Sequence, residues 1–263
     1  MMFYSDYISD EQLIKAVQNS SHLDKCYIGL CQKTWTNKSH KNLNLNLLNE
    51  ISSYAKNTEV IFIESKKAGL IDNATPAISE ALCRNHILDI ARQNKYDFMF
   101  IQDTDEFMIK EEYENIINDH VPNMNYYNCN SSGIRWKNFW KSWNYVIHSE
   151  ISNVPPYDGE WTNFGIDLHS DIKFTKNREH TSKNKCGVLQ DWFLFHASFI
   201  LTDDQVKEKL NTWGHSSDMN YDTWYQEKWL DWTPETTDLH PSTRPEIWKQ
   251  AVPYDGPLPK ECY

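Results

Sequence analysis

The sequence contains no cluster of Lys and Arg residues, and its 26 basic residues face 37 acidic ones, which gives a formal net charge of −11 at pH 7. A protein that grips duplex nucleic acid through its phosphates normally presents a continuous basic face. The charge balance therefore argues against nucleic acid as the main partner of this chain.

The sequence also lacks any apolar run long enough to cross a membrane. Its first residues have neither the basic segment nor the apolar segment of an export signal. We therefore expect no membrane span and a cytoplasmic location. The chain contains no internal repeat and no low-complexity tract, and its length suits one large domain over residues 1–263.

No pair of cysteines has the Cys-x-x-Cys spacing of a zinc site or a redox motif. The six cysteines are scattered along the chain, at Cys26, Cys31, Cys83, Cys129, Cys186 and Cys262. Free thiols in a reducing compartment are the expected state, because disulfides persist mainly in oxidising compartments.

The most informative stretch that is present runs from 96 to 107. An apolar segment, 98–101, is followed directly by Asp103, Asp105 and Glu106. Burial favours the apolar residues and opposes the acids, so the acids should emerge at the end of a buried strand. Asp103 and Asp105 would point to the same side, and two converging carboxylates attract a hard divalent cation. The alternative is a solvated acidic turn.

Apolar patterns predict alternating strands and helices in the first half of the chain. The predicted strands are 26–31, 59–64 and 97–102, and the predicted helices are 10–18, 43–54 and 77–93. Such alternation is typical of a mainly parallel, Rossmann-like sheet covered by helices, whose ligands gather at the carboxyl ends of the strands. We expect residues 1–120 to form this α/β half.

The second half, 121–263, has a weaker pattern. We predict a helix over 112–120 that stops at Pro122, strands at 125–130, 171–176 and 187–200, and a helix that ends near Thr212. The tail from Asp231 is rich in proline, so we expect it to wrap around the body of the domain.

Two blocks of the sequence resemble a known family. The first has Arg84-Asn85 in a predicted helix, followed by a strand and then by Asp103-Thr104-Asp105-Glu106-Phe107. The second is Phe195-His196-Ala197-Ser198, followed by a helix with Lys207 and Lys209 and then by Trp213-Gly214-His215. In this order they resemble the nucleotide-sugar half of GT-A-fold glycosyltransferases, in particular the family 2-like group. The Asp-Asp-Gly-Ser sequence that often ends the second strand in that group is absent here.

The resemblance implies a metal-dependent transferase that moves a hexose or pentose from a nucleotide-diphosphate donor, with a UDP-sugar favoured, to an acceptor hydroxyl on a glycan or another molecule. Asp105 and His196 would ligate Mn²⁺ or Mg²⁺, and Asp103 would contact the ribose and also the metal. The remaining donor contacts would come from four residues, namely Thr34, Glu64, Arg84 and Asn85. Arg84 would bind the diphosphate through its planar guanidinium.

Several assignments stay open. An inverting transfer needs a carboxylate base, for which Asp191 is preferred and Glu160, Asp167 and Asp171 compete, whereas a retaining transfer needs none. Three tryptophans are candidates for stacking on the acceptor or for the core, namely Trp136, Trp140 and Trp161. A non-catalytic sugar- or nucleotide-binding module with the same fold is the alternative function.

Overall fold

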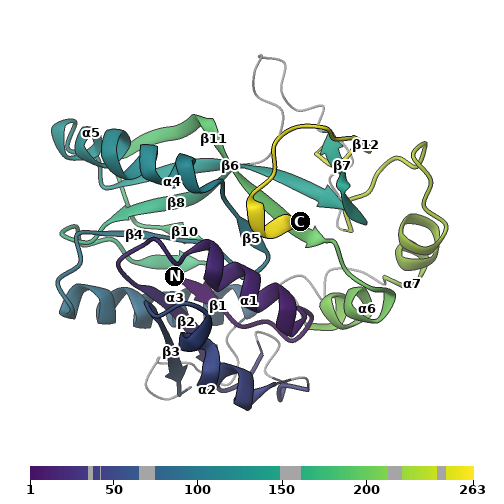
Figure 1. The fold of residues 1–263 in the computed structure, drawn as a ribbon, viewed down its shortest axis with the longest axis horizontal. Coiled ribbons are helices and arrows are strands. Elements are labelled where there is room, and N and C mark those ends of the chain that lie inside the picture. Colours follow the sequence, from purple (N-terminus) through teal and green to yellow (C-terminus); the bar gives the residue numbers. More distant parts are fainter. Residues whose placement is uncertain (35–37, 42, 65–74, 149–160, 213–220, 242–246) are drawn as a thin grey trace.

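The computed structural model describes residues 1–34, 38–41, 43–64, 75–148, 161–212, 221–241 and 247–263. It is a mixed α/β structure, as the sequence predicts (Figure 1). Two sheets, one of three strands and one of seven, lie next to each other, and the acidic stretch 103–106 lies where they meet.

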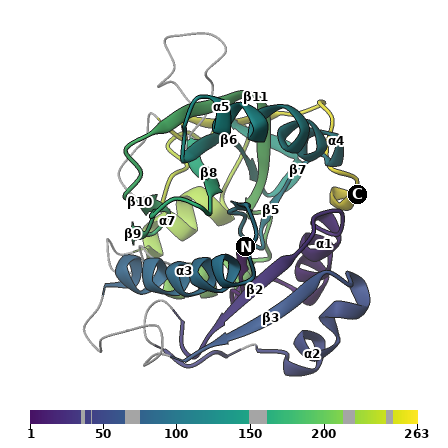
Figure 2. The same ribbon diagram turned by 90° about the vertical axis from the view of Figure 1, so that its left-hand side faces the viewer.

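The three-stranded sheet is parallel and is covered by helices on both faces. Its strands, in the order β1-β2-β3, are β1 (Met2–Phe3), β2 (Cys26–Cys31) and β3 (Thr58–Ile63). Helix α3 (Pro76–Gln93) covers one face, and α1 (Asp10–Asn19) and α2 (Leu45–Tyr54) cover the other (Figure 2). Ile28 packs into the α1 and α2 core, whereas Tyr27 and Ile87 belong to the core under α3.

The helices of this half begin where the sequence predicts. Thr75 caps α3, since its side chain accepts a hydrogen bond from the backbone N–H of Ile78, and Pro76 follows at the first helical position. Ser9 caps α1 in the same way through Gln12. The predicted strands 26–31 and 59–64 are confirmed to within one residue.

The larger sheet corrects the prediction of a mainly parallel architecture. Its strand order is β12-β7-β6-β11-β5, with β8 between β6 and β4, and the pairing of β6 with β11 is its only parallel one among the described residues. The strands are β4 (Phe98–Phe100), β5 (Glu106–Phe107), β6 (Ser131–Trp140), β7 (Ser142–His148), β8 (Trp161–Asp167), β11 (Lys185–Phe199) and β12 (Gln250–Pro253). The strand β8, which the sequence analysis missed, pairs antiparallel with both β4 and β6 and so joins β4 to this sheet.

The N-terminal strand β1 joins the two sheets and was also missed, because two residues are too short for a periodic pattern. The Met1 amine donates a hydrogen bond to the carbonyl of Phe100, and the Gln102 N–H donates to the carbonyl of Met1. The predicted strand 97–102 is therefore three residues long, and its continuation is held by β1 instead of by β2 or β3.

The predictions for 112–130 were wrong in two respects. The helix does not stop at Pro122: α4 (Lys110–Asn115) continues through a π-helical turn, Ile116–His120, into α5 (Val121–Tyr126). Pro122 follows directly on the π-helical turn, an irregularity of the kind that accompanies proline inside a continuous helix. The predicted strand 125–130 is helix and turn, and β6 begins only at Ser131.

The C-terminal region packs around Trp140 at one end of the large sheet. Helix α6 (Asp203–Thr212) buries Val206 and Leu210 in this core, and α7 (Asp222–Trp224) buries Trp224 against Trp140 and Phe199. The tail then adds β12 to the sheet and reaches α1, where Asn19 donates a hydrogen bond to Glu261. The predicted helix ending at Thr212 and the wrapping tail are thus confirmed.

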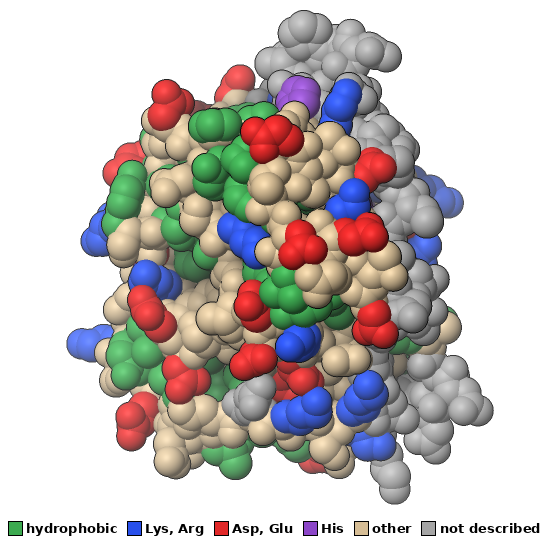
Figure 3. All heavy atoms as spheres, turned by 90° about the vertical axis from the view of Figure 1, so that its right-hand side faces the viewer, with side chains coloured by type: hydrophobic (Ala, Val, Ile, Leu, Met, Phe, Trp, Pro, Cys, Tyr) green, Lys and Arg blue, Asp and Glu red, His purple; other side chains and the backbone are tan. Residues whose placement is uncertain are grey.

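No helix within the described ranges is both long and apolar enough to cross a membrane. Acidic and basic side chains are interspersed on the face shown in Figure 3, without a continuous basic patch among the residues drawn in colour.

The cysteines differ from the prediction at two positions. Cys129, which follows α5, and Cys186, at the start of β11, form a disulfide. The two are 57 residues apart in the sequence, so only the fold brings them together. Cys26, Cys31, Cys83 and Cys262 are free and buried, as predicted. Since structural disulfides are typical of oxidising compartments, the cytoplasmic location stays a prediction.

Glu112 on α4 generates a prediction on stability. Burial raises the pKa of this carboxyl from 4.5 to about 7, although the Phe193 N–H donates a hydrogen bond to it. The folded state therefore favours the protonated form, and its contribution to stability is lost as the pH rises from 4.5 to 7. We expect Glu112→Gln to raise the free energy of unfolding by about 1–2 kcal/mol at pH 8 and to change it little at pH 4.5.

Urea denaturation at the two pH values measures this difference. The exposed neighbour Glu111 provides the control, because Glu111→Gln should leave the free energy of unfolding unchanged at both. Equal stability of Glu112→Gln and the wild type at pH 8 would contradict the raised pKa of Glu112.

Candidate functional site

The acidic stretch 103–106 is a turn between β4 and β5, and it faces two adjoining cavities. The larger cavity has a volume of about 330 Å³, and acids, Trp136 and His196 contribute to its walls. The smaller has a volume of about 140 Å³ and lies at the carboxyl ends of β1 and β2. Tyr7, Glu80 and Asp103 line both cavities, so these three side chains form the boundary between them.

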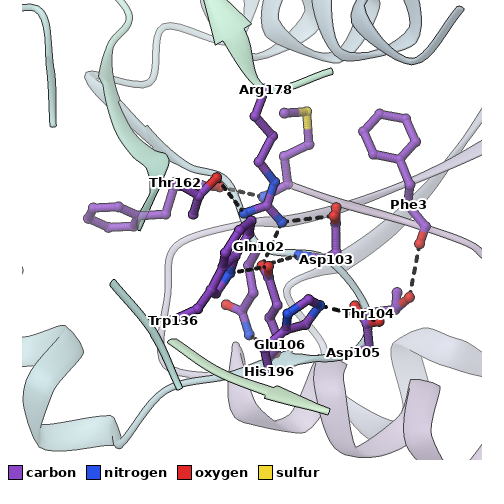
Figure 4. Close-up of polar contacts among 12 residues, drawn as sticks. Phe3, Gln102, Asp103, Thr104, Asp105, Glu106, Trp136, Thr162, Arg178 and His196 are labelled. Carbon is purple, nitrogen blue, oxygen red and sulfur yellow. Dashed lines mark hydrogen bonds and ion pairs between the residues drawn. The ribbon is translucent and has the colours of Figure 1, made fainter. Parts of the chain in front are cut away.

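Hydrogen bonds from buried polar groups fix the shape of the turn. The Thr104 hydroxyl donates to the carbonyl of Phe3 at 3.0 Å, which directs this side chain away from the cavity and toward β1 (Figure 4). The Asp103 N–H donates to the Glu106 carboxylate at 2.8 Å, and the Gln102 amide donates to the Glu106 carbonyl. Asp103, Asp105 and Glu106 all line the larger cavity, since the chain turns here and is not extended as predicted.

Asp103 is held between two arginines. Its Oδ1 lies 3.1 Å from Nη2 of Arg84, and its Oδ2 lies 2.8 Å from Nη2 of Arg178. Burial alone would raise the pKa of Asp103, but the two guanidinium groups outweigh burial and hold this pKa below its usual range. The side chain remains 34 % exposed, toward the cavities, so a ligand can still reach it.

Glu106 is fully buried beneath Asp103, where it holds neighbouring side chains in place. One oxygen accepts a hydrogen bond from Trp136 Nε1 at 2.7 Å, and the other lies 2.6 Å from Nη2 of Arg178. Because a buried carboxylate must be paired, Glu106 fixes both the indole ring and the guanidinium.

Arg178 has no counterpart in the sequence-based set of site residues. It lies in the hairpin of β9 (Phe174–Lys176) and β10 (Glu179–His180), directly after Asn177, whose φ of 47° makes the tight turn. Nothing in the local sequence marks this arginine, because its partners are about 72 residues away along the chain.

The position of Arg178 depends on Asn85. The Asn85 amide donates to the carbonyl of Phe174 at 2.9 Å and accepts from its N–H at 2.8 Å, which ties β9 to α3. The resemblance allows Asn85 to hydrogen-bond either nearby backbone or the donor, and in the structure its amide bonds the backbone and positions the hairpin. The adjacent Arg84 faces the acids directly, with Glu80 as its second partner at 2.6 Å.

Asp105 lies at the floor of the larger cavity, where two nitrogen groups approach one of its oxygens. His196 Nε2 and Lys209 Nζ each lie 3.6 Å from Asp105 Oδ2. Burial alone would raise the pKa of Asp105, but the neighbouring His196 and Lys209 lower it to about 2. Asp105 is thus an anion across the physiological pH range.

The side chains at Asp105 are of the types that ligate a divalent metal ion. His196 Nδ1 lies 2.7 Å from Asn138 Oδ1, an acceptor, so Nδ1 carries a proton and Nε2 is the nitrogen that faces Asp105. A carboxylate and an imidazole are acceptable ligands for Mn²⁺. Within the described ranges, no group of three or more His, Cys, Asp or Glu side chains is placed to hold a metal. Asp105 and His196 therefore fit an ion whose other ligands come from elsewhere. Asp103 does not join them, because its carboxylate is paired with Arg84 and Arg178.

Of the other described residues predicted to contact the donor or to act as the base, only Thr34 lines one of the two cavities. Thr34 lines the smaller cavity, whereas Glu64 at the end of β3 lines neither cavity. Asp191 is exposed on β11 and also lies outside both cavity walls. The competing bases Asp167 and Asp171 do not line them either, and Glu160 and His215 fall outside the described residues.

The three tryptophans differ in the same way. Trp136 lines the larger cavity and stacks on His196 with ring centroids 5.2 Å apart. Trp140 is fully buried in the C-terminal core and cannot reach a ligand, and Trp161 is exposed outside the cavity walls. Two residues of the tail, His240 and Trp248, also line the larger cavity and were not predicted.

Comparison of the chain with family models and with curated proteins gives no match. The resemblance to glycosyltransferases accordingly rests on the sequence motifs alone.

The ion pairs of Arg178 lead to a prediction on stability. Arg178→Met leaves Glu106 buried without a cationic partner and removes one of the two cations at Asp103. We expect a loss of about 3–5 kcal/mol in the free energy of unfolding at pH 7, the cost typical of breaking a buried ion pair.

Chemical denaturation monitored by tryptophan fluorescence measures the effect. Lys176 is the matched control on the same hairpin, since its side chain is 57 % exposed, and Lys176→Met should cost less than about 0.5 kcal/mol. Equal losses for the two variants would show that the hairpin, and not the ion pairs, determines the result.

Proposed function

We propose that the chain is a metal-dependent glycosyltransferase that binds a nucleotide-diphosphate sugar, such as a UDP-sugar, across the two cavities. The observation that carries the proposal is the buried guanidinium of Arg84. Its Nη2 pairs with Glu80 and Asp103, whereas its Nη1 is buried and has no hydrogen-bond partner among the described residues. Arg84 also lines the smaller cavity, and phosphate oxygens suit a guanidinium.

The charges around the site support a diphosphate at this position. Arg84 and Arg178 reach the boundary of the cavities, and Lys209 lines the larger one. Burial alone would lower the pKa of Arg178, but Asp103 and Glu106 raise it, so this cation stays charged. These three buried cations already face four carboxylates, so a bound divalent ion would supply the further positive charge that a diphosphate needs.

Asp105 and His196 would hold the metal ion. When bound, Mn²⁺ or Mg²⁺ stabilises the negative charge that develops on the diphosphate leaving group. Since the pKa of Asp105 is about 2 and that of Asp103 is also lowered, both carboxylates are weak bases at neutral pH. Their role is therefore to bind and orient, and the proton of the acceptor hydroxyl must go to another group.

The acceptor side of the site belongs to the larger cavity. Trp136 has one ring face on His196 and its indole N–H on Glu106, so its orientation is fixed from two sides. His240 and Trp248 bring the C-terminal tail to the same cavity. Rigid aromatic walls suit the C–H faces of sugars, so a glycan or another hydroxyl-bearing acceptor fits this half.

One observation favours the alternative, a non-catalytic binding module. Each carboxylate that lines the larger cavity (Glu80, Asp103, Asp105 and Glu106) already has a cationic partner, and Asp191 is remote from it. Metal-dependent hydrolysis of the nucleotide sugar in the absence of an acceptor separates the two functions. A transferase releases free sugar slowly, whereas a binding module releases none above the background.

Binding itself is tested by thermal unfolding with UDP-, GDP- and dTDP-sugars, with and without Mn²⁺. A donor at one hundred times its dissociation constant stabilises the folded state by about 2.7 kcal/mol, which raises Tm by about 5–10 °C in a chain of this size. We expect Asp105→Asn to abolish the Mn²⁺-dependent part of the shift, because it removes the anionic ligand.

Asp89 on α3 provides the control. Its side chain is 59 % exposed, so Asp89→Asn should keep the full shift. A shift that survives in Asp105→Asn would move the metal to another site, and the absence of any shift with all donors would refute the proposed function.

A further inference from the structure

The side chain of Lys209 on α6 is buried next to Asp105. It is 4 % exposed, and its ammonium donates to the carbonyl of Ser198 at 2.7 Å and to the hydroxyl of Ser198 at 2.6 Å. The rings of Tyr7 and Phe199 flank it, with centroids 4.6 and 4.9 Å from Nζ. These contacts hold Nζ at 3.6 Å from Asp105 Oδ2.

We propose that Lys209 acts as a built-in counter-ion of Asp105, which keeps the affinity of the free protein for divalent metal low and thereby couples metal binding to diphosphate binding. This inference rests on the proposed function, since it assigns the metal to Asp105 and the diphosphate to the same cavity.

The geometry makes the competition unavoidable. A divalent ion lies about 2.1 Å from a ligating carboxylate oxygen, so an ion on Asp105 Oδ2 would lie within about 6 Å of the Lys209 ammonium. In a buried site such like charges repel strongly. The ion also adds two positive charges to a region where Arg84, Arg178 and Lys209 already offset most of the four carboxylates.

A diphosphate removes this obstacle. Its negative charges offset those of the ion, and the Lys209 ammonium can then pair with a phosphate oxygen in place of Asp105. Metal and diphosphate therefore favour each other, and by linkage each raises the affinity for the other by the same factor. Lys209 is a positioning residue in this account, and it couples the binding of the metal ion to the binding of the diphosphate.

The test measures Mn²⁺ binding to the nucleotide-free protein by the loss of the EPR signal of free Mn²⁺. Two neutral variants remove the charge: Lys209→Met fits between the flanking rings, and Lys209→Gln also keeps a donor for the carbonyl of Ser198. Lys209→Arg retains the charge. We expect Lys209→Met and Lys209→Gln to bind Mn²⁺ at least tenfold more tightly than the wild type, and Lys209→Arg to bind it as weakly.

A second arm adds saturating UDP. It should raise the Mn²⁺ affinity of the wild type at least tenfold and that of the two neutral variants by a smaller factor. The inference is overturned if a folded neutral variant binds Mn²⁺ no more tightly than the wild type, or if the nucleotide-free wild type already binds Mn²⁺ as tightly as in the presence of UDP. Failure of the proposed function is a different result, in which neither UDP nor any nucleotide sugar binds the wild type at all.

Discussion

The structure depends on the requirement that buried carboxylates have cationic partners. Asp103, Asp105 and Glu106 lie in one short turn between two sheets, and three cations from distant parts of the chain converge on them. Arg84 comes from α3, Arg178 from the β9–β10 hairpin and Lys209 from α6. Since an unpaired buried charge costs several kcal/mol, the ion pairs hold α3, the β9–β10 hairpin and α6 against the turn.

This requirement also separates the acids into a buried one and an accessible one. Glu106 is sealed beneath Arg178 and Trp136, whereas Asp103 retains exposed surface at the boundary of the two cavities. The carboxylates with depressed pKa values remain anionic at neutral pH, so they attract a cation or orient a ligand but do not exchange protons. A site of this kind suits electrostatic binding of a diphosphate more than acid–base chemistry by the acids themselves.

The sequence predicted the local features of this arrangement well. The helices α1 and α3, the strands β2 and β3 and the acids at a strand end follow from apolar periodicity, a Thr-Pro helix start and the cost of burying charge. Arg84, Asp105 and His196 were placed at the site by resemblance, and the structure brings all three to the two cavities or their walls.

The remainder depends on contacts between distant segments, which no local pattern encodes. The strand β1 is two residues long and exists because its backbone pairs with β2 and with 100–102. Arg178 and Lys209 look like ordinary surface residues in the sequence, and only the fold buries them against the acids. Pro122 read as a helix stop because the packing of Tyr113 and Ile116 that maintains the helix is tertiary.

The most direct test of the central claim is a crystal structure of the protein with UDP and Mn²⁺. The account predicts the diphosphate at the boundary formed by Tyr7, Glu80 and Asp103, with Arg84 Nη1 donating to a phosphate oxygen and the ion between Asp105 and His196. A nucleotide bound elsewhere, with the ion pairs of Asp103 and Asp105 unchanged at saturating UDP and Mn²⁺, would contradict it.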